Sequence, residues 1–347
     1  MIIFVFILLM IIFLDMKTAK SGELFTDYMS REKTTAINGI FTILVLLSHA
    51  SGYIKLDGAF DAPYVTMKSY LGQMVVSTFL FYSGFGICES IKKKGMSYVK
   101  SIPFRRFFSV LYHSWIAVFL FVIVRLLLGK TFSVKEILLA LTFWEGVGNS
   151  NWYIFVILCL YLIVFVSFLV TRANKYLGTA LTTVLSVALV YLLIRSDRGS
   201  WWYNTIILYP CGMIFSLFKD KFDKIVLKND LTYFGLAGVV LGAYYFCYTK
   251  KGTGIEGYSL WAIMFVMLIL TLSMKVSINN GILQWFGTHV FSVYILQRIP
   301  MIVFTHFGLN TKKYAFVAMS FLVTIVLAVF FDAAMAKLDG VIYKKKS

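Results

Sequence analysis

The hydrophobic and polar positions of this chain alternate on the scale of whole helices. Ten apolar stretches, each long enough to cross a bilayer as a helix, are separated by short polar or charged segments. They fall roughly at residues 37–54, 71–91, 107–128, 151–170, 177–194, 203–218, 231–248, 257–274, 287–305 and 314–336. The pattern predicts an all-α polytopic membrane protein with a core of ten transmembrane helices.

Two further apolar segments are too short to be ordinary spans. Residues 1–14 would reach only about 21 Å at 1.5 Å per residue, so we expect an extra short N-terminal hydrophobic helix. This segment has no positive n-region and no cleavage signal after it, which disfavours a cleaved signal peptide. Residues 134–144 contain Lys135 and Glu136, and we expect a re-entrant or interfacial piece there.

Composition supports the membrane class. Hydrophobic residues make up 60% of the chain and charged residues 14%, with a mean hydropathy of +0.82, which excludes a soluble globular domain. A net charge of +17 would suit a nucleic-acid partner, but in a membrane protein it indicates basic cytoplasmic loops, so no nucleic acid is expected. The four cysteines lie in apolar segments without metal-ligand spacing, so we expect no metal site.

The distribution of basic residues predicts the topology. Placing the densest basic cluster (residues 92–106) in the cytoplasm leaves 21 Lys and Arg on the cytoplasmic side and 10 on the other. We therefore expect a multi-pass plasma-membrane protein with a cytoplasmic C-terminus. The expected parts are an extra N-terminal helix, a cytoplasmic linker, a transmembrane domain and a basic cytoplasmic tail, at residues 1–14, 15–36, 37–336 and 337–347.

One histidine stands out inside the first core span. His49 follows about 12 residues of apolar helix, so it lies roughly 18 Å from the cytoplasmic end, beyond the bilayer midplane. Ionisable side chains are costly in a membrane and usually mark a functional path, and histidine suits proton transfer near neutral pH. His49 is a candidate catalytic base. A buried structural histidine bonded to a neighbouring helix is the alternative.

An ordered set of motifs surrounds this histidine. Asn38-Gly39-Ile40 precedes Ser48-His49, and Ser83-Gly84-Phe85 follows on the next span. The later members are Arg105-Arg106, Asn151-Trp152-Tyr153, Tyr209-Pro210-Cys211-Gly212-Met213, and Phe286-Gly287-Thr288-His289 with Tyr294, Gln297, Arg298 and Pro300. In this order they resemble the acyltransferase 3 family, membrane-bound O-acyltransferases of bacterial surface glycans. The resemblance runs over about residues 34–336.

The resemblance implies an O-acetyltransferase, which transfers groups other than amino-acyl groups. It implies that His49 is the catalytic histidine and that Arg105 and Arg106 serve the acyl-CoA donor, with acetyl-CoA as co-substrate and no permanently bound cofactor. The chemistry of the residues agrees, because paired guanidinium groups suit the phosphates of coenzyme A. A basic loop that only determines topology remains the alternative for the two arginines.

Other candidates have two interpretations each. Ser83 and the Gly84 backbone could stabilise the tetrahedral oxyanion, and a close-packing residue between helices is the alternative for Gly84. Asn151, Trp152 and Tyr153 lie at the expected outer mouth, where an aromatic ring could stack on a sugar of the acceptor. An ordinary interfacial aromatic belt would look the same in sequence.

The chain departs from the family pattern at several positions. Asn38 stands where the family commonly has Arg or Lys eleven residues before the histidine, so Arg31 or Lys33 could carry that function. Gln297 replaces the histidine of a late Tyr-x-x-His element, and no acid on residues 151–170 could orient His49. Glu89 is the one acid near Ser83-Gly84-Phe85.

The acceptor and donor remain open at this level. We expect an acyl-CoA donor, membrane lipids around the helices, and a surface or exopolysaccharide glycan or its lipid-linked precursor as acceptor. A donor such as succinyl-CoA is one alternative, and a non-enzymatic glycan or solute transporter is another. No inverted repeat supports the transporter. One sequence carries no information on the oligomeric state.

Overall fold

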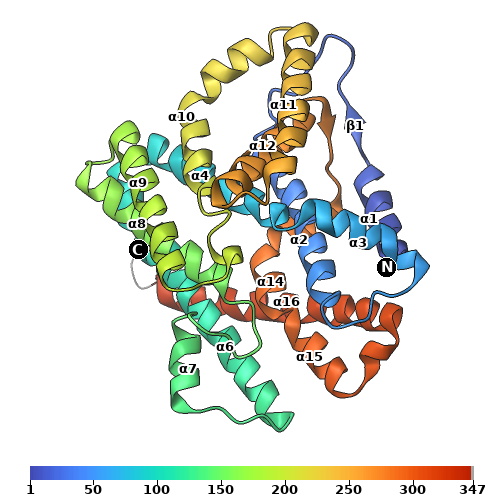
Figure 1. Cartoon of the computed structure of the whole chain (residues 1–347). Helices are drawn as coiled ribbons and strands as arrows, with labels where there is room; N and C mark the ends of the chain where they lie inside the picture. Colours follow the sequence, from blue (N-terminus) through green and yellow to red (C-terminus); the bar gives the residue numbers. More distant parts are fainter. Residues whose placement is uncertain (345–347) are drawn as a thin grey trace.

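The computed structural model describes residues 1–344, and this part of the chain is almost entirely helical (Figure 1). The helices up to the middle of the chain are α1 (Ile2–Phe13), α2 (Arg31–Ala50), η1 (Ala59–Asp61), α3 (Ala62–Leu71), α4 (Met74–Lys94), α5 (Met96–Ile102), η2 (Pro103–Phe108), α6 (Ser109–Leu127), α7 (Val134–Leu141) and α8 (Trp152–Val170). The later ones are α9 (Lys175–Arg195), η3 (Ser200–Trp202), α10 (Leu208–Val226), α11 (Asp230–Lys250), α12 (Ile255–Lys275), α13 (Gly281–Thr288), α14 (Val290–Leu296), α15 (Arg298–His306), η4 (Leu309–Thr311) and α16 (Lys313–Lys344).

Eight helical segments of residues 1–344 are long and apolar enough to cross a membrane. They lie at Arg31–Ala50, Ala59–Lys94, Met96–Leu127, Trp152–Val170, Lys175–Arg195, Asp230–Lys250, Ile255–Lys275 and Lys313–Tyr343. Helix α10 and the shorter apolar segment Val290–His306 occupy the positions of the other two expected spans. The prediction of an all-α polytopic membrane protein is confirmed, and the N-terminal apolar segment forms the 12-residue helix α1.

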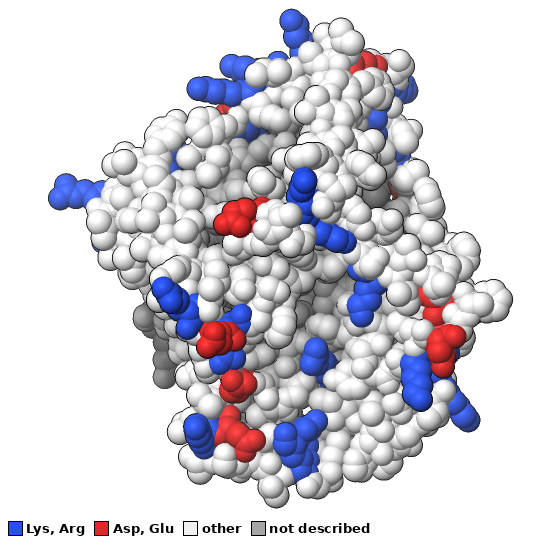
Figure 2. Space-filling view, in the orientation of Figure 1, with Lys and Arg blue, Asp and Glu red and all other residues white. Residues whose placement is uncertain are grey.

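The helices differ in how deeply they are buried. The apolar window of α2 is 67% buried and that of the segment containing α4 is 72% buried, against 11% for α11. Helices α2 and α4 therefore form the centre of the bundle, and α11 lies at its periphery. Most of the surface in Figure 2 is uncharged, with charged side chains in a few groups, as expected where helices face lipid.

Two glycines allow one close helix crossing at this centre, that of α4 with α10. A Cβ atom added to Gly84 of α4 would lie 2.0 Å from the Tyr209 carbonyl oxygen of α10, and one added to Gly212 would lie 2.0 Å from the Phe81 carbonyl oxygen. In membranes, small residues let helix backbones approach in this way. The structure therefore gives Gly84 a packing role.

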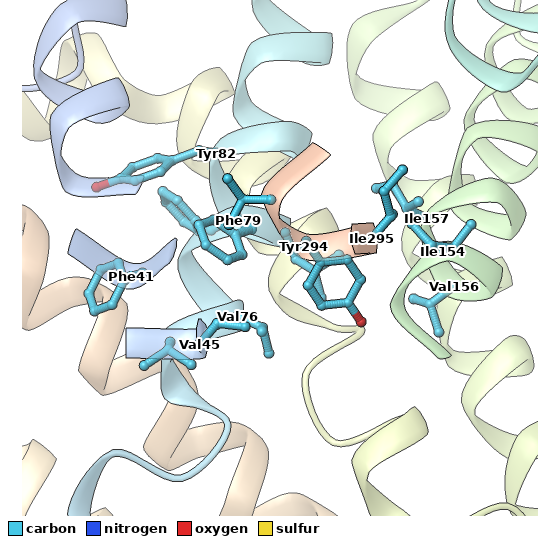
Figure 3. Close-up of a cluster of buried hydrophobic side chains, with 14 of the residues drawn as sticks. Phe41, Val45, Val76, Phe79, Tyr82, Ile154, Val156, Ile157, Tyr294 and Ile295 are labelled. Carbon is cyan, nitrogen blue, oxygen red and sulfur yellow. The ribbon is translucent and has the colours of Figure 1, made fainter. Parts of the chain in front are cut away.

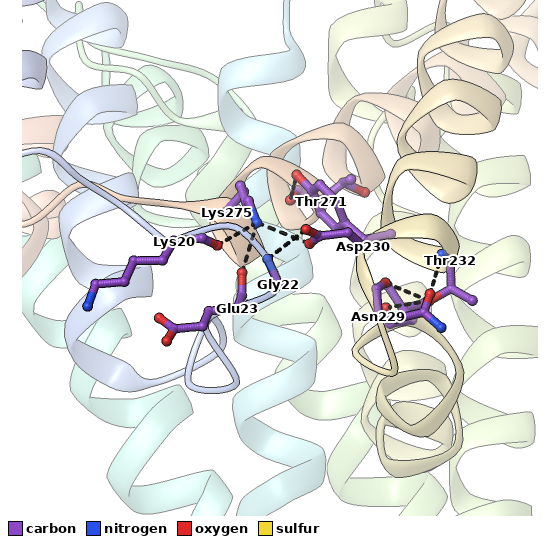
Figure 4. A network of polar contacts seen from close by, with 10 residues as sticks. Lys20, Gly22, Glu23, Asn229, Asp230, Thr232, Thr271 and Lys275 are labelled. Carbon is purple, nitrogen blue, oxygen red and sulfur yellow. Dashed lines mark hydrogen bonds and ion pairs between the residues drawn. The ribbon is translucent and has the colours of Figure 1, made fainter.

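The segment before α2 is tied to the far end of α12. Strand β1 (Lys17–Thr18) pairs antiparallel with β2 (Val276–Ser277). The Lys275 ammonium donates to the carbonyl oxygens of Lys20 and Glu23 and pairs with Asp230 at 3.2 Å (Figure 4). Asp230 also accepts from the Gly22 backbone N–H at 2.7 Å, so one carboxylate joins three segments.

Three segments depart from regular membrane-spanning helices: a short helix, a π-helical turn and a helix break. The short helix α7, in the segment expected to be re-entrant or interfacial, begins with a Ser133–Glu136 capping box. Hydrogen bonds from the backbone and side chain of Ser133 hold the pKa of the Glu136 carboxyl below its usual value. Residues Pro103–Phe108 form a π-helical turn, and the segment 287–305, expected as one span, is broken between α14 and α15.

The C-terminal helix is longer than the expected last span. Helix α16 continues to Lys344, so residues 337–344 of the expected tail extend the helix. Residues 345–347 of that tail lie outside the described residues.

Candidate active site

His49 lies in the last turn of α2, where polar groups from two other helices approach it. Its ring packs on Tyr294 of α14, with 6.2 Å between ring centroids. Gln297 lies beside the imidazole, and the charges of Arg298 and Lys68 act on it. The Nδ1 atom is buried and has no hydrogen-bond partner among residues 1–344. An unpaired ring nitrogen in a polar, buried setting can accept a proton from a bound substrate.

No carboxylate orients this histidine in the part of the chain described here. No Asp or Glu oxygen of residues 1–344 lies within 4.0 Å of its ring nitrogens, whereas His113 and His289 each have such a neighbour. Glu89 instead pairs with Lys92 at 2.6 Å and accepts from the Ser216 hydroxyl at 2.7 Å, near the other end of α4. The groups around His49 are therefore neutral or positively charged.

Lys68 of α3 holds the end of α2 next to the histidine. Its ammonium donates to the Ser51 hydroxyl at 2.7 Å and lies 3.5 Å from the Ser48 carbonyl oxygen. Tyr64 of the same helix donates to the Leu47 carbonyl oxygen at 2.9 Å. These contacts satisfy carbonyl groups that the helix end leaves free, and they fix the turn that carries His49.

The break between α14 and α15 places Gln297 against His49. Pro300 has no N–H to bond the Leu296 carbonyl, which weakens the helix at this point. Gln297 is fully buried, and its Nε2 atom donates to the Tyr294 carbonyl oxygen at 3.0 Å. Its Oε1 atom has no partner among the described residues. Gln297, which replaces the histidine of the Tyr-x-x-His element, therefore lies beside the candidate base His49.

A large cavity of about 1230 Å³ opens at the opposite end of α2 and α4. Its mouth carries the cations Arg31, Lys93 and Arg106, none of which has an acidic partner within 4.0 Å in residues 1–344. Lys92 and Lys219 also line it, but these two lysines pair with Glu89 and Asp223. Asp220 lines the cavity without a basic partner within 4.0 Å among the described residues, so the unpaired charges at the cavity are three cations and one acid, and positive charge prevails.

The deep end of this cavity continues into a smaller apolar chamber of about 360 Å³. Phe79, Ser83, Tyr153 and Tyr161 line both spaces, and Tyr294 lines the chamber. Figure 3 shows Phe79 and Tyr294 between α2 and α8. Because Tyr294 packs on His49, the space that begins at the basic mouth ends at the ring that contacts the candidate base.

The two arginines of the basic motif have different positions. Both lie on the π-helical turn Pro103–Phe108, a type of irregularity frequent at functional sites. Arg106 lines the large cavity, and its Nε donates to the Tyr98 hydroxyl at 3.3 Å. Arg105 lines an adjoining pocket of about 480 Å³ that also contains Arg106 and Lys94. Both can meet an anion at the cavity mouth.

The expected acceptor motif divides into structural and cavity-facing residues. Asn151 donates from its Nδ2 atom to the Phe143 carbonyl oxygen at 2.8 Å, which holds the loop before α8. Tyr153 lines both cavities and packs edge-on against Tyr294, with ring centroids 5.6 Å apart. Trp152 packs edge-on against Tyr153 at 5.7 Å. Ser83 lies beside Tyr161 and lines the same chamber as Tyr294. His49 contacts Tyr294 but does not line the chamber.

The position eleven residues before His49 lies in the cavity wall. Asn38 and Arg31 both line the large cavity, and the Asn38 Oδ1 atom is buried without a partner in the described chain. Lys33 instead pairs with Asp27 at 2.7 Å and lies over the Phe25 ring. Of the two basic residues considered as substitutes, Arg31 is therefore the one that faces the cavity.

Sequence reasoning missed several residues that the fold brings together here. Lys68, Tyr161 and Tyr82 carried no motif, although each lies at the site or its cavity. Tyr294 and Gln297 were noted only as part of a departure from a pattern. The available signal in the sequence was their position just before Pro300, where a helix is expected to break. That Tyr294 contacts His49 of α2 depends on the tertiary fold.

The fold and these cavities define a multi-pass membrane protein with an internal cavity that is basic at its mouth, apolar at its deep end, and reaches Tyr294 beside His49. A family model described as an acyltransferase domain matches residues 35–333. The chain therefore belongs to the acyltransferase 3 family, as the sequence motifs predicted, and is a membrane acyltransferase. No curated protein and no solved structure matches it in the same comparisons.

Proposed function

We propose that this protein is an O-acetyltransferase of a bacterial plasma membrane. It would move an acetyl group from cytoplasmic acetyl-CoA to a hydroxyl of a surface or exopolysaccharide glycan, or of its lipid-linked precursor. The observation that carries the proposal is the path from a basic cavity mouth to Tyr294 beside His49. The positive-inside rule supports a cytoplasmic location for that mouth and for the C-terminus.

The donor would bind with its phosphates at the mouth and its pantetheine arm in the narrowing cavity. Arg106, Arg105 and Arg31 offer planar charge-assisted hydrogen bonds to phosphate oxygens. The apolar chamber between Phe79 and Tyr294 suits the uncharged pantetheine arm and thioester. Trp152, Tyr153 and Asn151 remain candidates for acceptor binding, with Asn151 acting through the loop that it holds.

The reaction would use His49 as general base. The imidazole takes the proton of the acceptor hydroxyl while that oxygen attacks the thioester carbonyl. A C–O bond forms, the C–S bond breaks, and the leaving thiolate of coenzyme A receives the proton from the imidazolium. Gln297 positions the ring, and Ser83 is a candidate donor to the oxyanion. An acyl-histidine intermediate is the alternative route.

The decisive experiment measures transfer of radiolabelled acetyl from acetyl-CoA in membrane vesicles. His49→Gln should abolish transfer at matched expression and folding, whereas wild type should label vesicle glycan or lipid. The matched control is His289→Gln, since His289 stacks on Trp285 and lines none of the described cavities. Equal labelling by wild type and His49→Gln would remove His49 from the chemistry.

A second arm of the same experiment replaces acetyl-CoA by succinyl-CoA. Transfer from succinyl-CoA but not from acetyl-CoA would change the donor and keep the enzyme class. Absence of transfer from either donor above an empty-vector background would contradict the proposed reaction.

A further inference from the structure

A second cationic cavity lies at the end of the bundle where α2, α6 and α15 finish. It has a volume of about 290 Å³, the space of about ten waters at ~30 Å³ each, which would hold one charged group with part of a sugar ring. Arg125, Lys130 and His306 line it, together with the Thr305 hydroxyl. No acidic side chain lines this cavity, so its walls carry uncompensated positive charge.

Arg125 is the central residue of this cavity. It lies in the last turn of α6, inside a candidate membrane span, and its Nε atom is buried without a hydrogen-bond partner in residues 1–344. No acid of the described chain lies within 4.0 Å of it. The Thr305 Oγ1 atom is likewise buried and unpaired. Both residues are partly exposed, but these two buried polar atoms without partners are costly unless a ligand supplies an acceptor.

The loop that precedes α8 packs against two residues of the cavity wall, Arg125 and Ile302. Gly148 has φ +114°, a conformation that L side chains rarely adopt, and a Cβ added to it would lie 2.9 Å from Ile302 and 3.7 Å from the Arg125 guanidinium. The loop backbone thus reaches the arginine only because residue 148 is glycine. The same loop carries Ser150, which lies against Tyr294 of the candidate active site.

Helix α15 places this cavity next to His49. Ile302, which lines the cavity, follows Arg298 by four residues along α15, and the Arg298 charge acts on His49. Four residues are about one helical turn, or roughly 6 Å. The cavity therefore begins about one turn beyond the candidate base, on the side away from the donor cavity.

We propose that this cavity binds a negatively charged group, phosphate or carboxylate, carried by a sugar of the acceptor. The assignment as acceptor site rests on the proposed acyltransferase function, whereas anion binding itself does not. Arg125 and Lys130 would bind the anion, and Thr305 would donate to it. The acceptor is therefore an acidic or phosphorylated saccharide, held with a hydroxyl toward His49.

The test is ligand-dependent thermal stabilisation of the purified full-length protein in neutral detergent. The probes are glucuronate and glucose 1-phosphate, with glucose as the uncharged control, all at constant ionic strength. Stabilisation follows the ratio of ligand concentration to Kd, so the shift yields an affinity without any acyl transfer. Both charged sugars should bind wild type more tightly than glucose, and Arg125→Gln should raise their Kd about tenfold or more.

Two further variants make the result specific. Lys130→Gln changes an exposed loop residue and should raise Kd about threefold, so it decides the question if Arg125→Gln does not fold. Arg195→Gln is the matched control, because Arg195 is exposed at the end of α9 and contacts Tyr191. Its Kd values should equal those of wild type.

Three outcomes would overturn the proposal. One is binding of glucose as tight as that of the charged sugars, and another is unchanged affinity in both Arg125→Gln and Lys130→Gln. The third is Arg125-dependent stabilisation by phosphatidylglycerol nanodiscs that charged sugars do not displace, which would assign the cavity to a lipid headgroup. Because no donor is present, failure here leaves the acetyl-transfer test of His49 unaffected, and the reverse also holds.

Discussion

Gly84→Ala should separate helix α4 from helix α10, which crosses it closely. The added Cβ would lie 2.0 Å from the Tyr209 carbonyl oxygen and 2.9 Å from its carbonyl carbon. Ordinary contact begins at 3.4 Å, so α4 and α10 must move apart by about 1.4 Å (3.4 minus 2.0) along this direction. The opposing atoms belong to the backbone and cannot rotate away, so the strain must be taken up by the helix crossing.

The expected cost follows from overpacking in a dense interior, which is about 1–3 kcal/mol. Gly86→Ala is the matched control on the same helix, because nothing lies within 4 Å of its added Cβ. In that open position alanine favours the helix by up to about 1 kcal/mol relative to glycine. The same gain applies to Gly84→Ala, so it cancels, and the two variants should differ by the overpacking cost of about 1–3 kcal/mol in the free energy of unfolding.

The assay is unfolding of the purified full chain in mild detergent, by heat and by graded SDS, followed by circular dichroism. Equal stability of Gly84→Ala and Gly86→Ala would refute the close-crossing argument. Gly212→Ala faces the same crossing from α10, with its Cβ 2.0 Å from the Phe81 carbonyl oxygen. The double variant should cost less than the sum, because one substitution already separates the helices. Full additivity would contradict a shared crossing.

The remaining predictions concern the donor, the base and the N-terminal segment. Arg106→Gln should raise the KM for acetyl-CoA about tenfold or more, whereas Lys100→Gln, exposed on the same basic segment, should leave it unchanged. Gln297→Leu should lower kcat about tenfold to a hundredfold with the donor KM unchanged, because it removes the unpaired Gln297 Oε1 atom, whose hydrogen bond to the imidazolium formed during the reaction would be worth about 1.5–3 kcal/mol. A parallel rise in KM would instead indicate a distorted cavity. Asp230→Asn should increase amide hydrogen exchange in residues 17–23 by up to about fivefold, since it breaks a partly exposed ion pair with Lys275. Unchanged amide exchange would mean that the β1–β2 pairing, and not the Asp230–Lys275 ion pair, holds residues 17–23 in place.

The sequence predicted the helices well because hydropathy determines what can enter a bilayer. It was less accurate about where they end. The expected span 203–218 is the helix Leu208–Val226, which continues through the charged residues Lys219 to Lys224. Backbone hydrogen bonding and packing on α4 hold that extension, and neither depends on apolar character. The break at Gln297 divides a segment whose hydropathy is continuous.

The candidate site was predictable only in part, because its contacts are long-range. His49 stood out as an ionisable residue in an apolar helix, and the basic motif stood out by charge. Nothing local indicates that Tyr294 packs on both His49 and Tyr153, or that Lys68 holds the end of α2. The position of α14 against α2 follows from the close crossing of α2 and α13, which Gly39 and Gly287 permit. A periodic pattern identifies a helix face and leaves its partner undetermined.

The break in the α14–α15 segment explains how polar groups collect beside His49 inside a membrane. A continuous helix would use every carbonyl and present mainly apolar side chains, whereas the Pro300 break allows a buried glutamine at position 297. Gln297 Oε1, His49 Nδ1, the Tyr294 hydroxyl and Arg298 Nε are all buried without partners in the described chain. Each such atom costs about 1–3 kcal/mol if it stays unpaired. Under the proposed function the acceptor hydroxyl and the thioester carbonyl would supply the missing partners, so the cost falls when both substrates are bound and the site favours the assembled complex over the empty one.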